Sequence, residues 1–434
     1  MKKITTVILA AGKSTRFKHK KSKIFQDLAG IEIISHVYQV AKKISNKEVV
    51  FVCNKENIIE IKNKFPYAKC VLQKNQKGTA DAIVCAKKYI KNKNVLILFG
   101  DVPLLSSTTI TKLFNNYVKN GSIGSMIAFK TNNPYGYGRV KTIDKKIISV
   151  VEEINTSLTE KKILLCNSGV MLCNTKLLFS NINKISDKNL KKEKYLPDIF
   201  QIFNNLEKSF SYIICLKEET LGINTIDDLI LVDKILQKKL KANIIKNGVI
   251  LQQPETIRLC VDTKIKKGSI IEPFVTFKPR VLINENVLIK SYSVIEECSI
   301  GENSSIGPSA RIRPKSKIGK NTKIGNFVEI KNSVIGNKNS ISHLSYIGDS
   351  HLGNNVNVGA GTITCNYDGK DKHKTKIGEG SFVGTNSSLV APINIGKNAY
   401  VGAGSTITKD IPDNALGVGR SKQINKENWS KEKK

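Results

Sequence analysis

Hydrophobic residues in the carboxy-terminal half of the chain recur at every sixth position. One run comprises Ile300, Ile306, Ile312, Ile318, Ile324 and Ile330, and a second comprises Ile377, Val383, Leu389, Ile395, Val401 and Ile407. Glycine often follows the aliphatic residue. A period of six is typical of hexapeptide repeats, in which three hexads complete one triangular turn of a parallel β-helix. We therefore expect a left-handed parallel β-helix whose core is a ladder of aliphatic side chains.

The repeat is interrupted between Val358 and Ile377. The positions at which aliphatic residues are due hold Thr364 and then polar residues of the segment "CNYDGKDKHKTK". The interval of 19 residues equals one turn of the coil plus one residue. We expect the coil to keep its number of turns while a polar loop leaves it, and such loops on rigid scaffolds often carry function.

The amino-terminal half has a different pattern, in which short apolar runs alternate with amphipathic segments. Strands are predicted at "ITTVILA", "EVVFVC" and "NVLILFG", and helices at "ISHVYQVAKKI" and "TADAIVCAKKYIK". This alternation predicts a Rossmann-like α/β domain with a mostly parallel sheet. A long amphipathic helix follows, and Gly248 can end it. The expected organisation is an α/β domain (1–226), a linker helix (227–247) and the β-helix with a basic tail (248–434).

Composition adds a strong positive charge, because 70 basic and 36 acidic residues among 434 give +34. The lysines are spread evenly and accompany many asparagines and isoleucines, which favours codon bias over a specific nucleic-acid partner. Weak attraction to anions such as phosphorylated substrates still follows. Nine cysteines without metal-site spacing indicate free thiols and a cytoplasmic protein. No apolar run reaches the ~18 residues of a membrane span, and no signal peptide is evident.

Two segments of the amino-terminal half have the chemistry of a phosphate and metal site. The turn "LAAGKSTR" follows the first predicted strand, where backbone N–H groups with Lys13 and Arg16 can hold phosphates. A P-loop is excluded, because its first glycine is replaced by Val7. Asp101 ends another buried strand, and a carboxylate there is suited to Mg²⁺. A turn-forming aspartate before Pro103 is the structural alternative.

The repeat itself points to a second site. Arg313 and Lys331 stand where glycine usually follows the aliphatic residue, and they are one turn apart, about 4.8 Å along the coil. Two cations this close repel unless an anion such as a sugar phosphate lies against them; an exposed pair in water is the alternative. His343 lies near Glu329 and Tyr346 in the sequence and is suited to act as a general base.

The chain contains, in this order, "LAAGKSTR", Lys23, "QKGTA", "FGDVPLL", "PYGYGRV", "VVEE", "CNSG" and "GIN". In order and approximate spacing these motifs resemble those of the sugar-phosphate nucleotidyltransferases. With the hexapeptide half, nearly the whole chain resembles the bifunctional enzymes that join an N-acetylglucosamine-1-phosphate uridyltransferase to a glucosamine-1-phosphate acetyltransferase. The resemblance implies Mg²⁺, UTP and acetyl-CoA as partners, a homotrimer, and UDP-N-acetylglucosamine for cell-wall precursors as the product.

Roles follow from the resemblance at each matching position. In the nucleotidyltransferase site, Leu9, Ala10, Ala11, Gly12, Gln73, Gly78 and Thr79 would hold the nucleoside, Lys13, Arg16 and Lys23 the triphosphate, Asp101 and Asn224 the metal, and Gly138, Glu152 and Asn167 the sugar, with Phe99 and Gly100 beside Asp101. In the acetyltransferase site, His343 would be the base and Glu329 would orient it. The sugar phosphate and acceptor would contact Arg313, Lys331, Tyr346, Asn357, Asn366 and Tyr367, and coenzyme A would contact Ala360, Thr385, Ala403 and Arg420. The segment "KDKHKTK", including His373, is expected to be solvated filler.

The chain departs from the family pattern at a few loop positions, since Ser14 replaces a glycine, Ser22 a proline, and Ala80–Asp81 a Gly–His pair. Two other functions are weighed against the bifunctional enzyme. One is a single nucleotidyltransferase of the ADP-glucose pyrophosphorylase type with a structural or regulatory β-helix, and His343 argues against it. The other is a cationic scaffold protein, which the polar residues Asp101, Glu152 and Asn224 disfavour.

Overall fold

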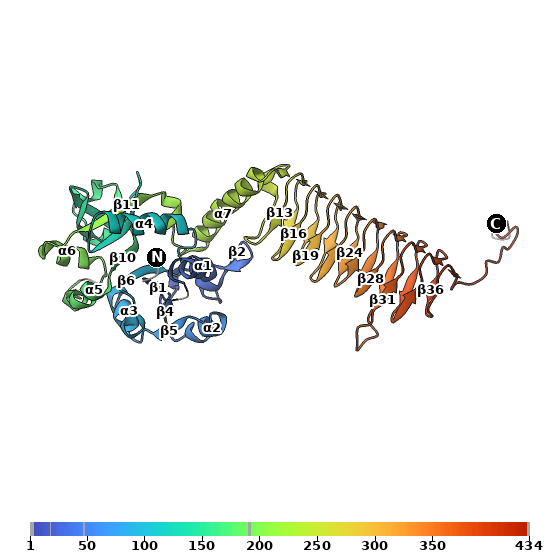
Figure 1. Ribbon diagram of the computed structural model, residues 1–434, viewed down its shortest axis with the longest axis horizontal. Coiled ribbons are helices and arrows are strands. Elements are labelled where there is room, and N and C mark those ends of the chain that lie inside the picture. Colours follow the sequence, from blue (N-terminus) through green and yellow to red (C-terminus); the bar gives the residue numbers. More distant parts are fainter. Residues whose placement is uncertain (1–3, 18, 47, 190–191, 432–434) are drawn as a thin grey trace. The chain divides into compact units, whose positions relative to one another are not determined.

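The computed structural model describes residues 4–17, 19–46, 48–189 and 192–431, and the chain divides into two compact units (Figure 1). The first unit is Met1–Leu236 and the second is Gln237–Lys434. The boundary falls within the long helix α7 (Ile226–Lys246). No helix in the described ranges has the length and apolar character needed to cross a membrane.

The first unit is built on a nine-stranded sheet. Its strand order is β5 (Lys69–Leu72), β4 (Val49–Cys53), β1 (Ile4–Leu9), β6 (Asn94–Phe99), β10 (Leu165–Asn174), β7 (Gly124–Lys130), β11 (Phe210–Cys215), β9 (Lys146–Val151) and β8 (Arg139–Ile143). The strands β5, β4, β1 and β6 are parallel, and β10 runs antiparallel to both of its neighbours. The predicted α/β class is confirmed, with a parallel half followed by a mixed half. A short hairpin, β2 (Asp27–Leu28) and β3 (Ile31–Glu32), stands apart from the sheet.

Helices cover both faces of this sheet, because successive strand residues point to opposite sides. The core on one face packs against α3 (Thr79–Ala86), α5 (Thr175–Asn181) and α6 (Asp198–Asn205). The core on the other face packs against α1 (Ile33–Ser45), α2 (Ile58–Lys64) and α4 (Ser107–Lys119). This three-layer arrangement leaves the carboxyl ends of β1, β5 and β6 free to form a site, as expected for parallel strands.

The second unit is a coil of short parallel strands that form three sheets (Figure 1). The first sheet extends from β12 (Ile250–Leu251) to β37 (Leu416–Gly417), the second from β13 (Lys264–Ile265) to β34 (Ile393–Ile395), and the third from β15 (Thr276–Phe277) to β36 (Thr406–Ile407). Neighbouring turns are 18 or 17 residues apart, as in Ile306–Ile324 and Ile324–Ile341. The predicted aliphatic ladder is buried as one continuous core. The expected parallel β-helix is therefore confirmed.

The carboxy-terminal part of α7 closes the first turns of the coil. Leu240 and Ile244 pack against the ladder. The buried side chain of Gln237 donates to the carbonyl of Leu259 at 2.7 Å and accepts from its N–H at 3.0 Å. The amide of Gln237 therefore pairs with the backbone N–H and carbonyl of Leu259 at the start of the coil, where no preceding turn is present to do so.

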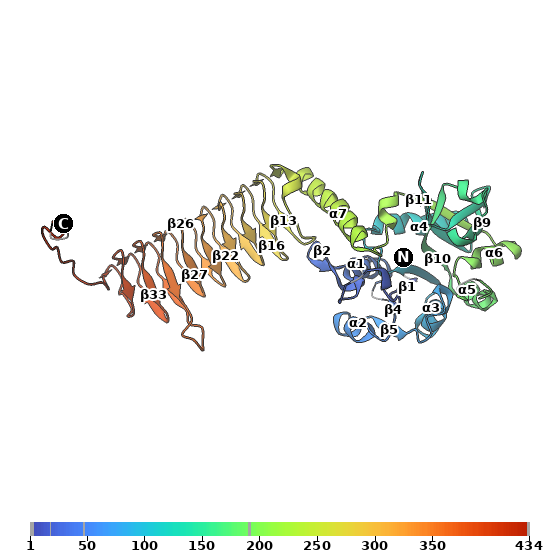
Figure 2. The same cartoon turned by 180° about the vertical axis from the view of Figure 1, so that it is seen from behind.

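The interruption of the repeat is a true loop, but its predicted length was wrong. Val358 lies in β29 (Asn357–Val358) of the first sheet, whereas Ile377 lies in β31 (Thr375–Ile377) of the second. Leu352 pairs with Ile377, 25 residues further on. The interval is therefore two-thirds of a turn with about seven extra residues, not one turn with a single extra residue. The loop starts after β30 (Ile363–Cys365), and Figures 1 and 2 show it projecting from the side of the coil.

Candidate active sites

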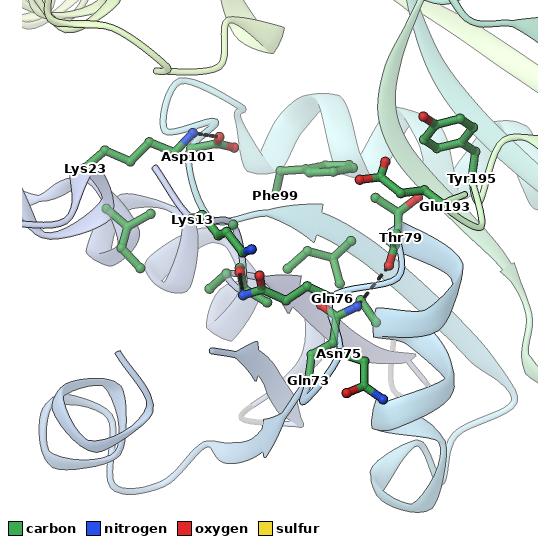
Figure 3. Close-up of a pocket in the computed structure, with 17 residues that line it drawn as sticks. Lys13, Lys23, Gln73, Asn75, Gln76, Thr79, Phe99, Asp101, Glu193 and Tyr195 are labelled. Carbon is green, nitrogen blue, oxygen red and sulfur yellow. Dashed lines mark hydrogen bonds and ion pairs between the residues drawn. The ribbon is translucent and has the colours of Figure 1, made fainter. Parts of the chain in front are cut away.

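The turn after β1 lines a cavity of about 440 Å³ at the carboxyl edge of the sheet (Figure 3). The cavity contains most residues predicted for the nucleotide: Leu9, Ala10, Ala11, Gly12, Lys13, Lys23, Gln73, Gly78, Thr79, Phe99 and Asp101. Gly100 is not among the residues that line it; its N–H donates to the carbonyl of Leu9 at 2.9 Å. Ser14, where the family has glycine, adopts a left-handed φ of 55°. A non-glycine residue there stores strain on the order of 1 kcal/mol.

Three amide side chains donate to the carbonyl groups of this turn, and sequence reasoning assigned a site role to none of them. Asn57 donates to the carbonyl of Ala10 at 2.7 Å, and Gln76 donates to that of Ala11 at 2.8 Å. Asn54 lies at 3.4 Å from the carbonyl of Gly12 and bonds reciprocally with Asn57. Because side chains bond its carbonyls, the turn is held in one conformation, and its N–H groups can serve an anion.

Asp101 and Asn224 converge on one cation position, which Lys23 fills. The Lys23 ammonium lies 2.5 Å from Oδ2 of Asp101 and 3.0 Å from Oδ1 of Asn224 (Figure 3 shows the contact with Asp101). Lys23 is buried, with 8% of its surface exposed. Lys23 was expected to contact the triphosphate, but in the structure it contacts the two predicted metal ligands. Two oxygens that share one cation also suit a divalent ion whose other ligands are phosphates and water.

A second cavity, of about 590 Å³, adjoins the first and shares Phe99 and Asp101 with it. It brings together the other predicted residues of this half: Arg16, Gly138, Glu152, Asn167 and Asn224. Gly138 permits the close packing, since a Cβ there would lie 3.0 Å from Val150 and 3.6 Å from both Asn167 and Glu152. The polar groups around this cavity suit a hydroxyl-rich ligand.

An ion pair between a buried arginine and a partly exposed glutamate braces the loop that forms one wall of this second cavity. Arg139, only 2% exposed, lies 2.7 Å from the carboxylate of Glu153. The same carboxylate accepts from the N–H of Gly136 at 3.0 Å. The hydrogen bond from Arg139 holds the pKa of Glu153 below its ordinary value, with a smaller contribution from the Gly136 N–H.

In the coil, the two predicted phosphate-binding cations are in register on successive turns. Ile312 pairs with Ile330, which places Arg313 beside Lys331. Glu329, in β24 (Glu329–Lys331), lies 2.7 Å from the guanidinium of Arg313. The predicted role of Glu329 in orienting His343 is therefore not seen, because its carboxylate pairs with arginine instead.

Asn326 is the side chain that contacts His343. The two residues are in register on neighbouring turns, and Oδ1 of Asn326 lies 2.5 Å from Nδ1 of His343. An amide oxygen can only accept, so this contact assigns the proton to Nδ1 and leaves Nε2 free to take one. Sequence reasoning missed Asn326 because the partner lies a full turn away.

The predicted coenzyme A positions continue the same corner of the coil beyond His343. Val358 pairs with Ile341 and Val383, and Val383 pairs with Val401. Two residues further along each strand, these registers align His343, Ala360, Thr385 and Ala403. Arg420 lies near this line, with its Cδ 3.7 Å from the position of a Cβ on Gly404. A linear ligand can therefore lie along the corner and end at the histidine.

The polar loop after Cys365 returns to the side of the coil that carries Lys331. Asn366 donates to Asp349, and the backbone N–H of Asp349 donates to the carbonyl of Lys331 at 3.0 Å. A side-chain contact with Lys331, together with repulsion between the ammonium groups, lowers the pKa of Lys372. Lys372, in the segment expected to be solvated filler, therefore lies close to Lys331.

His373 is also part of the structure of the loop. Its Nε2 lies 2.7 Å from Oδ2 of Asp368, whose other oxygen accepts from the N–H groups of Lys370 and Asp371. The hydrogen bond from His373, with these backbone bonds, holds the pKa of Asp368 well below its ordinary value. His373 thus braces the loop from within, and the expectation that its segment does not contact substrate stays a prediction.

Comparisons with known proteins agree with this division into two catalytic halves. Residues 6–165 match the MobA-like NTP transferase domain, residues 294–367 the GMPPB C-terminal domain, and residues 374–409 the bacterial transferase hexapeptide (six repeats). Together with the fold and the two clusters, these matches define a two-domain transferase, in which a nucleotidyltransferase precedes a hexapeptide-repeat transferase.

Relatives of known name extend over almost the whole chain. The bifunctional protein GlmU of Rhodopseudomonas palustris is 41% identical over 98% of this chain and 95% of its own length. GlmU of Bradyrhizobium sp. is 39% identical over 97% and 95%, and GlmU of Thermosipho africanus is 38% identical over 99% and 97%. The chain therefore belongs to the GlmU family of bifunctional enzymes.

Proposed function

We propose that the two halves catalyse consecutive steps toward UDP-N-acetylglucosamine, a precursor of the cell wall. The coil would acetylate glucosamine-1-phosphate with acetyl-CoA, and the α/β domain would then transfer uridylyl from UTP to N-acetylglucosamine-1-phosphate. Two separate clusters within a chain that matches GlmU proteins over nearly its full length carry this proposal.

In the uridylyl step, an oxygen of the sugar phosphate attacks the α-phosphorus of UTP, and the bond to the departing pyrophosphate breaks. No protein nucleophile is needed, so the chain acts by positioning and by neutralising charge. The turn at Leu9–Gly12, with Lys13 and Arg16, would hold the phosphates. Gly138, Glu152 and Asn167 would hold the sugar in the adjoining cavity.

The metal is proposed to be Mg²⁺, held by Asp101 and Asn224. The position that Lys23 now occupies supports this, because its ammonium bonds both oxygens. When bound, Mg²⁺ neutralises phosphate oxygens and favours departure of pyrophosphate. Lys23 would exchange its contact with Asp101 for the phosphates of the substrate, which restores the role that the resemblance implies.

In the acetyl step, the amino group of glucosamine-1-phosphate attacks the thioester carbonyl of acetyl-CoA. Nε2 of His343 would accept the proton of the amine, and the coenzyme A thiolate leaves as the carbon–sulfur bond breaks. Arg313, Lys331 and Lys372 would bind the phosphate of the sugar. Tyr346, Asn357, Asn366 and Tyr367 would hold its acceptor side. Coenzyme A would lie along the corner formed by Ala360, Thr385 and Ala403 toward Arg420, and a backbone N–H near Ala360 would stabilise the oxyanion.

The proposal includes a homotrimer assembled through the coils. Apolar side chains occupy one corner of the coil on four of five consecutive turns, with Ser309 on the turn between the second and the third. These apolar residues are about half exposed or more: Phe274 (49%), Tyr292 (63%), Phe327 (61%) and Leu344 (60%). All four have positive φ, a backbone conformation that disfavours bulky residues, so their retention is explained by burial against further copies of the chain. Sedimentation equilibrium should give about three times 48.1 kDa, and a monomer would contradict the trimer.

A cytoplasmic location completes the proposal and rests on nine free cysteines, since such thiols persist in a reducing compartment. Cell fractionation tests it, and recovery of the enzyme outside the cytoplasmic fraction would contradict it.

The two-site proposal is tested with purified protein, glucosamine-1-phosphate, acetyl-CoA, UTP and Mg²⁺, from which UDP-N-acetylglucosamine should form. His343→Ala should abolish acetyl transfer and leave uridylyl transfer intact, and Asp101→Ala should do the reverse. The exposed residues His351 and Asp187 provide matched controls as His351→Ala and Asp187→Ala. Loss of both activities from one site variant that remains folded would exclude two independent sites.

A further inference from the structure

Gln73 lies in the wall of the nucleotide cavity, where it is held by the backbone and almost fully buried. Its N–H donates to the carbonyl of Cys53 at the end of β4, at 2.9 Å, and only 5% of the residue is exposed. Figure 3 shows its side chain in the cavity wall near Gln76 and Thr79. A buried amide can present either its oxygen or its NH₂ group to a ligand, and the neighbouring residues decide which.

The hydrogen bonds around Gln73 determine that orientation. Nε2 donates to the carbonyl of Gly78 at 3.0 Å and to Oδ2 of Asp81 at 2.7 Å. Both partners accept and neither can donate, so both hydrogens of the amide are used. Within the described part of the chain no hydrogen bond reaches Oε1 of Gln73. This oxygen is also not fully enclosed by the protein. The amide therefore offers its oxygen, an acceptor, to the cavity.

Asp81 contributes more to this arrangement than the carbonyl of Gly78. A hydrogen bond to a carboxylate is about twice as strong as one between neutral groups. Turning the amide over would place Oε1 of Gln73 against the carboxylate of Asp81, which is repulsive. The carboxylate thus stabilises one orientation of an amide that would otherwise be held only by a neutral bond.

We propose that Asp81 determines the base specificity of uridylyl transfer by holding Gln73 as a hydrogen-bond acceptor. This inference rests on the proposed function, in which Gln73 lies on the nucleoside side of UTP. The ring N3 of uracil carries a hydrogen and donates to such an acceptor. The ring N3 of cytosine has a lone pair instead, so CTP would bring two acceptors together in a desolvated site. A site built to bond a ligand group rejects an analogue that lacks it.

The test measures kcat/KM for UTP and for CTP with N-acetylglucosamine-1-phosphate, by release of pyrophosphate. In Asp81→Leu the amide can turn, and we expect the UTP to CTP ratio to fall at least tenfold. Asp81→Asn keeps an acceptor of the same shape without the charge and should give an intermediate ratio. The control is Glu60→Leu, which removes an exposed acid from the first turn of α2 and should leave the ratio unchanged.

The outcomes separate this inference from a purely structural role and from the proposed function. If Asp81 only supports the start of α3, its loss should reduce both nucleotides equally, and a ratio within twofold of the parent would overturn the inference. If Asp81→Leu does not fold, the ratio of Asp81→Asn decides, and a change of threefold or more supports specificity. Failure of the parent enzyme to form any UDP-sugar would overturn the proposed function first.

Discussion

The amide of Asn57 provides the sharpest test of how the phosphate turn is held. Asn57 is 2% exposed and makes two buried hydrogen bonds, to the carbonyl of Ala10 at 2.7 Å and from the N–H of Asn54 at 3.1 Å. Asn57→Ala removes both bonds. The carbonyl of Ala10 and the N–H of Asn54 each lose a buried partner, which costs about 1–3 kcal/mol per group. The total is on the order of 2–6 kcal/mol.

This free energy is expected to divide between the fold of the first unit and the order of the turn. The turn keeps its bonds to Gln76 and Gly100, so part of its geometry survives. If the variant must use about 1.4 kcal/mol of the binding free energy of UTP to order the turn, KM for UTP rises tenfold. The remainder should lower the thermal midpoint of the first unit by several degrees, at about 2–4 °C for each kcal/mol in a domain of this size.

The assay follows initial rates of uridylyl transfer against UTP concentration, with acetyl transfer measured on the same preparation. Acetyl transfer should not change, because the coil carries that site. Asn63→Ala, at an exposed position of α2, which begins directly after Asn57, is the matched control and should behave as the parent. An Asn57→Ala enzyme whose KM for UTP and melting temperature both equal those of the parent would refute the reasoning, because the amide would then not hold the turn.

Two further predictions concern other contacts. Asn326→Ala should lower kcat for acetyl transfer about tenfold without affecting uridylyl transfer, because Nδ1 of His343 loses the partner that fixes its tautomer. Asn337→Ala removes another amide that bonds across turns of the coil, to the N–H of Lys320 at 2.8 Å, and is a useful comparison. Equal effects of both changes would point to general loosening. Arg139 holds the pKa of Glu153 below its ordinary value of 4.5, so the ion pair should stabilise the first unit above about pH 4.5 and lose this effect as the pH falls further. Melting curves from pH 7 to pH 3 should show Glu153→Gln less stable than the parent at pH 7, with the difference closing in acid; a constant difference would show that ionisation of Glu153 is not involved.

The sequence alone determined the architecture of both units. A period of six predicted the β-helix, and the ladder from Ile300 to Ile407 is buried as one core. Alternating strands and helices predicted the α/β unit, and the turn at Leu9–Gly12 meets Asp101 at the edge of its sheet. Such features can be predicted because periodicity reports a local geometry that repeats along the chain.

The partners of the site residues were decided only by the tertiary structure. Asn57 lies 47 residues from Ala10, and Lys23 lies 201 residues from Asn224, yet each pair is in hydrogen-bond contact. His343 is contacted by Asn326 and not by the expected Glu329, whose carboxylate forms an ion pair with Arg313. The loop after Cys365 adds about seven residues to its turn, a length that the polar segment alone could not indicate. Patterns of apolar residues record which side chains must be buried. They do not record which polar groups meet, because that depends on the distances between segments that only the completed fold brings together.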